Sequence, residues 1–233
     1  MGPGALPARR WQLSLPPVDI HHCPSPNCGP RRDGLTPQLV VLHYTAMASA
    51  EAAIERLCDP AAEVSAHYVI CKSGPVTQLV GEGMRAWHAG AGAWHGLDDI
   101  NSRSIGIELD NDGQEPFAEP LMQSLEALLH RILMGWAIPA ENVIGHSDMA
   151  PGRKFDPGPH FDWQRLEAKG LAAPTLVPSV DGRTAADFMR LARTAGYTAQ
   201  ADAQALLDAV RLRHRPEARG PLTQADFDAL SRR

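Results

Sequence analysis

The stretch VIGHSDMAPGRKFDPGP, residues 143–159, combines a short β-branched run, a histidine and a loop rich in glycine and proline. The run at its start predicts a buried strand that ends at His146. Lys154 and Asp156 follow on the loop. A histidine at a strand end, with a carboxylate and a lysine nearby, indicates a metal site with a charged helper group. The alternative is a surface loop carrying a Lys–Asp pair.

The prolines of this loop predict which way its side chains point. A proline disfavours the helical region for the residue before it, so we expect Asp156 to be extended. Side chains two apart in an extended chain point the same way. Lys154 and Asp156 should therefore face one side together, with Phe155 facing the other.

The overall composition is that of a globular protein. The chain has 233 residues, of which 44% are hydrophobic and 21% charged, and this length suits one sizeable domain or one domain with a small appendage. The net charge is −5 and the pI about 6.0, which gives no support for binding nucleic acid or an anionic membrane. No apolar run approaches the roughly 20 residues that span a bilayer.

The four cysteines show no CxxC pair and no zinc-finger spacing. In a chain of this length they are expected to be reduced thiols. The alternative is a metal bound by Cys23 and Cys28 with the neighbouring His21 and His22. The other two cysteines are Cys58 and Cys71.

Two other apolar stretches each contain a polar residue whose burial has to be explained. QLVVLHYTA, residues 38–46, predicts a strand buried on both faces that is closed by His43. SIGIELDN, residues 104–111, predicts a strand with Glu108 inside it, and a buried acid is costly unless it is paired or functional. The alternatives are a hydrogen-bonded core histidine and an acid that faces solvent.

The remaining elements before residue 169 follow from ordinary signals. Residues 1–37, rich in Pro, Gly and Arg, predict an irregular arm. Ser49 is a candidate N-cap of a helix to about Leu57, and residues 67–80 predict a hairpin. A second helix should run from Pro120 to about Met134, with Gly135 as its C-cap.

The loop AWHAGAGAWHG, residues 86–96, is a candidate wall of a binding site, because glycine allows close approach and aromatic rings offer flat apolar surface. The alternative is a packed loop with structural histidines. The candidate contacts are Trp87, His88, Gly90 and Trp94.

The composition changes after Trp163. Residues 169–182 predict a linker, and residues 183–233 predict a small all-α module with a thin core, separable from the preceding domain at 38–168. Its three helices should start at about Thr184, residue 199 and Thr223.

Taken together, the candidates are typical of a zinc hydrolase. His43, His146 and Asp156 leave a fourth tetrahedral position open, as a catalytic zinc requires. Glu108 could take a proton from the attacking water, and Lys154 could stabilise the oxyanion that forms on a carbonyl. This set suffices to hydrolyse an amide.

The sequence also resembles the zinc-dependent N-acetylmuramoyl-L-alanine amidases, the group that includes phage T7-type lysozyme and the peptidoglycan recognition proteins. The resemblance covers about residues 25–160 and keeps the family's order. The matching pieces are SPNCGPRRDG, LVVLHYTAM, AHYVICKSGPVTQLVGE, AWHAG, NSRSIGIELDN and IGHSDMAPGRKFDPG.

The resemblance implies a mixed α/β fold (α+β) in which helices flank a central mixed sheet. It implies Zn²⁺ on His43, His146 and Asp156, with Glu108 as the catalytic acid and Lys154 as the oxyanion-stabilising lysine. The implied reaction splits the amide between the lactyl group of muramic acid and the L-Ala of the stem peptide.

The nearest subgroup resembles bacterial enzymes that accept anhydro-muropeptides, and residues 183–233 resemble a peptidoglycan-binding module. The expected partners are peptidoglycan fragments or murein, and Arg85 and Arg103 could pair with a stem-peptide carboxylate. No secretion signal is visible, which favours a cytoplasmic recycling enzyme; an envelope location is the alternative if a signal has been removed. Two other functions stay open: a non-catalytic peptidoglycan receptor and a zinc peptidase that cuts within the stem peptide.

Overall fold

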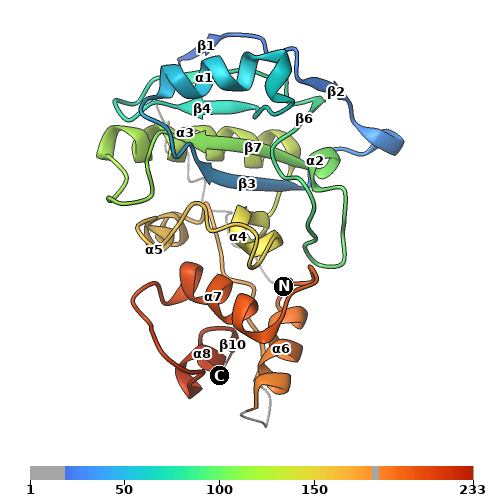
Figure 1. The fold of residues 1–233 in the computed structure, drawn as a ribbon, viewed down its shortest axis with the longest axis vertical. Helices are drawn as coiled ribbons and strands as arrows, with labels where there is room; N and C mark the ends of the chain where they lie inside the picture. Colours follow the sequence, from blue (N-terminus) through green and yellow to red (C-terminus); the bar gives the residue numbers. More distant parts are fainter. Residues whose placement is uncertain (1–18, 180–183, 233) are drawn as a thin grey trace, which may run out of the picture.

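A computed structural model describes residues 19–179 and 184–232. Figure 1 shows a sheet with its covering helices above a group of three C-terminal helices, and helix α4 lies between the two parts. The prediction of a mixed α/β fold, with a central mixed sheet flanked by helices, is confirmed.

The central sheet has six strands in the order β1-β5-β4-β7-β3-β8. Strand β3 pairs in parallel with both β7 and β8, whereas β4 and β5 form the predicted antiparallel hairpin. The strands are β1 (Ile20–His22), β3 (Leu39–Tyr44), β4 (Tyr68–Ile70), β5 (Val76–Gln78), β7 (Ser104–Leu109) and β8 (Val143–Gly145).

Helices cover both faces of this sheet. Ser49 caps α1 as predicted, because its side chain accepts a hydrogen bond from the backbone N–H of Ala52. The helices are α1 (Ala50–Cys58), α2 (Ile100–Arg103), α3 (Glu119–Trp136), α4 (His146–Met149), α5 (Trp163–Ala168), α6 (Ala185–Thr194), α7 (Ala203–His214) and α8 (Gln224–Asp228). Short 3-10 turns lie at Arg32–Gly34, Pro60–Ala62 and Ala140–Asn142.

The alternation of side chains along β3 assigns each face of the sheet a different role. Val40 and Leu42 pack with the predicted apolar stripe of α3 in one core cluster. Leu39 and Val41 point to the opposite face, into a second cluster, and His43 shares that face. The functional residues discussed below therefore lie on the face away from α3.

The irregular arm predicted for residues 1–37 is wrong for part of its length. Strand β1 joins the edge of the central sheet beside β5, and β2 (Cys28–Pro30) pairs with β6 (Met84–Ala86). Both strands have only three residues, too few to show a periodic pattern. Residues 1–18 lie outside the described part of the chain.

Gly135 is not the C-cap of α3. The helix continues to Trp136, and Ala137 in the left-handed conformation ends it. The indole N–H of Trp136 donates a hydrogen bond to Glu82 at 2.6 Å, which holds the last turn against the loop between β5 and β6. This tertiary contact overrides the tendency of glycine to end a helix.

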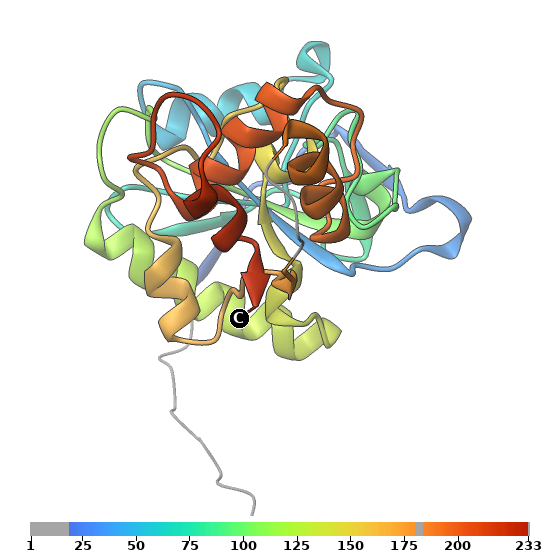
Figure 2. The same cartoon turned by 90° about the horizontal axis from the view of Figure 1, so that it is seen from below.

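The C-terminal helices are not a module with a separate thin core. Side chains of α6, α7 and α8 share one hydrophobic cluster with Leu39, Val41 and Ile144 of the central sheet. The predicted linker also contributes strand β9 (Val177–Pro178), which pairs with β10 (Ser231–Arg232) near the C-terminus. Figure 2 shows these orange and red helices lying across the sheet.

Candidate metal centre and active site

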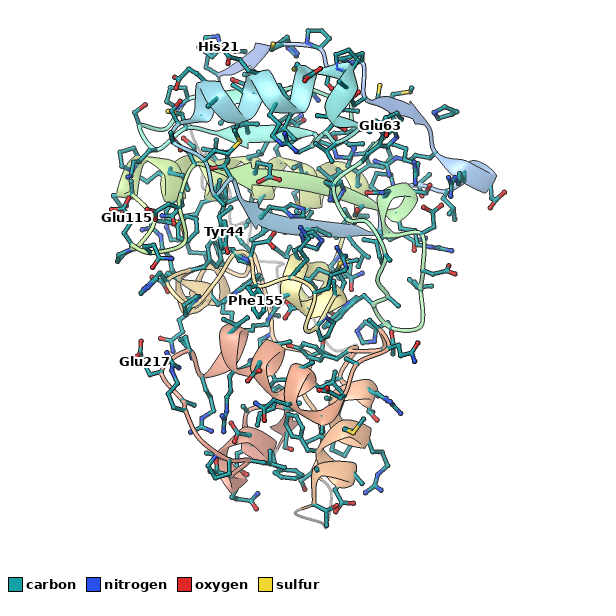
Figure 3. All side chains as sticks on the ribbon, in the orientation of Figure 1. His21, Tyr44, Glu63, Glu115, Phe155 and Glu217 are labelled. Carbon is teal, nitrogen blue, oxygen red and sulfur yellow. The ribbon has the colours of Figure 1, made fainter. Side chains whose placement is uncertain are left out.

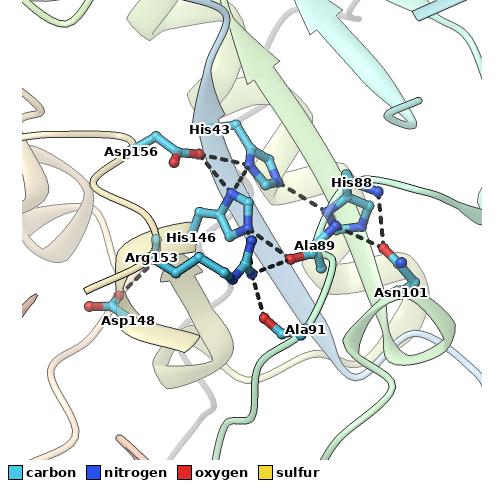
Figure 4. A network of polar contacts seen from close by, with 10 residues as sticks. His43, His88, Ala89, Ala91, Asn101, His146, Asp148, Arg153 and Asp156 are labelled. Carbon is cyan, nitrogen blue, oxygen red and sulfur yellow. Dashed lines mark hydrogen bonds and ion pairs between the residues drawn. The ribbon is translucent and has the colours of Figure 1, made fainter. Parts of the chain in front are cut away.

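The parallel pairing of β3, β7 and β8 brings the predicted catalytic side chains to one place. His43 is opposite Glu108 in the register of β3 and β7, and on its other side β3 pairs with β8, directly after which His146 begins α4. The loop that follows α4 returns Asp156 to the same place (Figure 4). Three segments that are far apart in sequence thus meet at the carboxyl ends of these parallel strands.

The three predicted ligands lie within direct contact of one another. Nδ1 of His43 is 2.9 Å from Nδ1 of His146, and Oδ2 of Asp156 is 2.9 Å and 3.0 Å from these two nitrogens. All three side chains are buried. Among the described residues this is the one group of three or more His, Cys, Asp or Glu side chains that could hold a metal ion, so the alternative site at the N-terminal cysteines does not form.

The hydrogen bonds around His146 turn its Nδ1 toward the cluster. Nε2 of His146 is 2.9 Å from the carbonyl oxygen of Ala89, which can only accept, so Nε2 donates to it. Nδ1 then faces the Asp156 carboxylate oxygen 3.0 Å away. A positive charge at this point, from a bound metal ion or from a proton on Nδ1, satisfies both atoms.

The spacing and chemistry of these atoms fit a small tetrahedral ion. Zinc bonds of about 2.0–2.1 Å place neighbouring ligand atoms about 3.3 Å apart, close to the observed separations. The carbonyl of Ala89 that orients His146 is a typical outer partner of a metal-bound histidine. The residues present therefore fit a metal held by two imidazoles and one carboxylate.

The electrostatics of the three side chains agree with this reading. Burial by itself would raise the pKa of Asp156, but hydrogen bonds with His146 and His43 hold it well below its usual range. Burial, followed by the neighbouring His146, lowers the pKa of His43 to about 4. Asp156 is thus a carboxylate and His43 a neutral imidazole near neutral pH, which are the forms that bind metal.

Glu108 lies beside the three proposed ligands, and one of its carboxyl oxygens has no hydrogen-bond partner in the described part of the chain. Its Oε2 is buried and has no hydrogen-bond partner within residues 19–179 and 184–232. Burial, with the nearby Asp156 carboxylate as a second cause, raises the pKa of Glu108 to about 8. A carboxyl group whose pKa lies near neutrality is suited to proton transfer.

A cavity of about 650 Å³ opens over these residues. Lys154 and Asp156 both line it, as predicted, but Phe155 borders it as well. Phe155 is 55% exposed and lies near Tyr44, another residue of the cavity wall (Figure 3). That its side chain faces the opposite way from those of Lys154 and Asp156 stays a prediction.

Four of the proposed substrate contacts lie at this cavity or at the smaller one beside it. Trp87 and His88 line both cavities, and Gly90 and Arg85 line the smaller one. Arg85 also lies 3.5 Å from Asp99. Contact of these residues with substrate stays a prediction.

Two other proposed contacts lie elsewhere. Trp94 is 2% exposed and packs edge-to-face on Tyr197 of the C-terminal module, with ring centroids 5.0 Å apart. Arg103 borders neither cavity and donates from Nε to the carbonyl oxygen of Asp98. An aromatic ring in a glycine-rich loop and an arginine before a strand do not reveal from sequence which side they face.

Arg153 and Asn101 support the site and were not singled out in the sequence. The guanidinium of Arg153 donates to the carbonyl oxygens of Ala89 and Ala91, and the Asn101 side chain accepts from the N–H groups of His88 and Ala89. Both hold the glycine-rich loop against the metal cluster (Figure 4). Only the position of Arg153, next to Lys154, hinted at a role.

These features define a hydrolase-like site with a candidate metal centre on a mixed sheet, and comparisons with known proteins agree with this class. The family model for N-acetylmuramoyl-L-alanine amidase matches residues 33–159, which is more than half of the chain. The chain belongs to this family, and the predicted family is confirmed.

Relatives with known names support the same conclusion. The chain is 39% identical over 152 residues to N-acetylmuramoyl-L-alanine amidase AmiD of Escherichia coli, covering 58% of this chain and 54% of that protein. It is 35% identical over 168 residues to 1,6-anhydro-N-acetylmuramyl-L-alanine amidase AmpD of Enterobacter cloacae, covering 65% and 90% respectively. The chain thus matches about half the length of the first relative and most of the second.

Similarity to a solved structure extends beyond the region that the family model matches. The E. coli AmiD complex with anhydro-N-acetylmuramic acid-L-Ala-D-γ-Glu-L-Lys superposes with a TM-score of 0.74 at 32% identity, covering 87% of this chain and 88% of that one. A coverage of 87% includes part of the C-terminal helices. No described helix is both long and apolar enough to cross a bilayer.

Proposed function

We propose that this protein is a zinc-dependent N-acetylmuramoyl-L-alanine amidase that cleaves the amide between (anhydro-)N-acetylmuramic acid and the L-Ala of the stem peptide. The observation that carries the proposal is the meeting of His43, His146 and Asp156 beside Glu108 at one end of an open cavity. Support for the substrate comes from the related AmiD structure, whose bound molecule is an anhydro-muramoyl peptide.

His43, His146 and Asp156 would hold the zinc. A bound zinc supplies a Lewis acid that polarises a carbonyl and lowers the pKa of water. Glu108, which pairs with His43 in the strand register, would accept a proton from the attacking water and pass it to the departing L-Ala nitrogen. Lys154 offers a positive charge at the same cavity, where the carbonyl oxygen becomes negative.

Product analysis tests the bond that is cut. We expect incubation with an anhydro-muropeptide to release a peptide with a free L-Ala amino group together with the unpeptidylated sugar, as resolved by mass spectrometry. The Glu108→Gln variant is the control for contaminating activity. Cleavage between peptide residues would instead show a peptidase, and binding without products would show a receptor.

Metal content tests the ligands. Replacing His43 or His146 by Ala should remove most of the zinc that copurifies with the protein, as measured by elemental analysis, whereas His130→Ala on the exposed face of α3 should not. Full zinc content in both ligand variants would contradict the assignment. Because ligands bind only when deprotonated, we also expect zinc to be released at acid pH.

Three experiments test the physiological context. Comparing rates on soluble anhydro-muropeptide and intact murein would separate recycling from wall remodelling. Co-sedimentation of the Glu108→Gln chain with insoluble murein would test whether the protein binds it, and fractionation of the native protein would test the cytoplasmic location.

A further inference from the structure

His88 lies against the sheet between a metal ligand and strand β7. Its ring occupies the space above Gly106, where an added Cβ atom would come within 2.5 Å of the ring. Ser104, Gly106 and Glu108 alternate along β7 and so share one face of the sheet. The glycine in the middle of this buried strand is therefore explained by the space that the His88 ring occupies.

A chain of hydrogen bonds fixes the protons on His88. The hydroxyl of Ser104 donates its one hydrogen to the carbonyl oxygen of Ile100 at 2.6 Å, and a carbonyl oxygen can only accept. The Ser104 oxygen must then accept from Nε2 of His88, which is 3.1 Å away. This places the proton of His88 on Nε2 and leaves Nδ1 as an acceptor.

The same logic continues to His43. Nδ1 of His88 is 3.0 Å from Nε2 of His43, so Nε2–H of His43 donates to it. Nδ1 of His43 is then unprotonated, and it faces His146 and Asp156 at 2.9 Å. The donor and acceptor of each hydrogen bond in this chain are thus fixed by the carbonyl oxygen of Ile100, which can only accept.

The two histidine ligands thus have different supports. A backbone carbonyl, that of Ala89, orients His146 directly. His43 depends instead on two side chains, which substitution can remove. Figure 4 shows the contact between His43 and His88 beside the cluster.

We propose that His88, itself held by Ser104, is a positioning residue that fixes the tautomer of His43 and so directs the Nδ1 lone pair at the metal. The proposal rests on the metal role given to His43 above. Outer partners of this kind typically change metal affinity by about 10–100-fold.

Three substitutions separate this role from simple packing. His88→Phe keeps a ring over Gly106 but removes both nitrogens, whereas His88→Asn keeps an acceptor close to the position of Nδ1. Ser104→Ala removes the group that sets the direction of the hydrogen bonds. His130→Phe, at an exposed position of α3, is the matched control.

The first measurement is the zinc dissociation constant of the full chain, by competition with a chelator at fixed pH. We expect about 10–100-fold weaker binding for His88→Phe, weaker binding for Ser104→Ala, and recovery of most of the affinity in His88→Asn. Zinc binding by His88→Phe that equals the wild type would overturn the proposal. If His88→Phe does not fold, Ser104→Ala removes a single oxygen and serves the same purpose.

The second measurement reads the tautomer itself in the metal-free chain. Long-range ¹H–¹⁵N NMR spectra should show His43 protonated on Nε2 in the wild type and a mixture of tautomers in His88→Phe. A wild-type His43 protonated on Nδ1 would sink the proposal. Because this measurement needs neither zinc nor turnover, a failure of the amidase or zinc assignment would be seen separately.

Discussion

At the scale of single residues, the register of two parallel strands decides the chemistry. His43 and Glu108 are paired across β3 and β7, so their side chains emerge side by side on the same face. A shift of one residue would turn either side chain into the core beneath α3. The proposed proton-transfer group and one of the proposed metal ligands are therefore positioned by the same ladder of hydrogen bonds.

This placement gives Glu108 a role distinct from that of the ligands. Glu108→Gln should keep zinc and thermal stability but lower turnover by about 10²–10⁴-fold, because general acid–base help is lost. The measurement is turnover of an anhydro-muropeptide with zinc content determined on the same sample. Glu55→Gln, on the exposed face of α1, is the control. Near-normal turnover would make Glu108 an ordinary buried polar group.

Sequence identified these residues because each is a polar exception at a predictable place. His43 and His146 close apolar runs, and Glu108 interrupts one. His88 offered no such signal, because its partners Ser104 and His43 come from other elements. Histidine in a glycine-rich loop suggests surface or substrate, whereas its actual contacts depend on the packing of three segments.

At the scale of elements, one arginine of α7 holds the turn that presents His146. Arg213 pairs with the buried Asp148 at 2.8 Å, and the other contact of that carboxylate oxygen is the N–H of Gly145. Arg213 also donates to the carbonyl oxygen of Val143. Helix α7 thus directly supports strand β8 and helix α4, which carry the proposed ligand His146.

Arg213→Met should therefore destabilise the protein strongly. It leaves the Asp148 carboxylate buried without its charge partner, which typically costs about 3–5 kcal/mol. Urea unfolding of the zinc-loaded chain measures this cost, with Arg193→Met at an exposed position of α6 as the control. A change in unfolding free energy as small as that of the control would mean that Asp148 is satisfied by other groups.

The next residue of α7 predicts a pH dependence. Burial, with Arg213 as a second cause, lowers the pKa of His214 from 6.5 to about 3. Between pH 6.5 and about 3, His214 is protonated in the unfolded chain but stays neutral in the folded chain. The free energy of unfolding therefore falls as the pH drops below about 6.5. His214→Gln removes this penalty.

Thermal melting at several pH values tests the effect. We expect the melting temperature of His214→Gln, taken relative to the wild type, to rise as the pH falls from 7 to 5. Metal loss affects both proteins and so cancels in the difference. If the difference in melting temperature stays constant with pH, then the folded state does not lower the pKa of His214.

The same elements show where sequence patterns end. The capping boxes at Thr184 and Thr223 start α6 and α8 as predicted, because a cap is a local signal. Helix α7 starts later than predicted, at Ala203, because the side chain of Asp202 caps it. Helices of four residues, such as α2 and α4, are too short for any period to show, and contacts from distant elements hold them.

At the scale of the whole molecule, one hydrophobic core joins the sheet to the C-terminal helices. Several buried apolar residues that precede residue 169 lie in that shared cluster, among them the four side chains of Leu39, Val41, Ile144 and Met149. The linker-like composition of residues 169–182 predicted that the helices after it form a separable module. The sequence of a short amphipathic helix shows which side is apolar, but it does not show which part of the protein that side packs against.

A truncated chain of residues 1–173 should consequently be unstable. Exposing one large apolar side chain costs about 1.5–3 kcal/mol, so full exposure of the four would cost roughly 6–12 kcal/mol, comparable with the whole stability of a domain at about 5–15 kcal/mol. The truncation also removes Arg213 from Asp148. We expect aggregation or a strongly lowered melting temperature in circular dichroism and size-exclusion experiments. Supplying residues 174–233 as a separate chain should restore part of the stability if the loss comes from packing. A truncated chain that melts within a few degrees of the full protein and keeps its zinc would show instead that the amidase domain stands alone, as the composition first indicated.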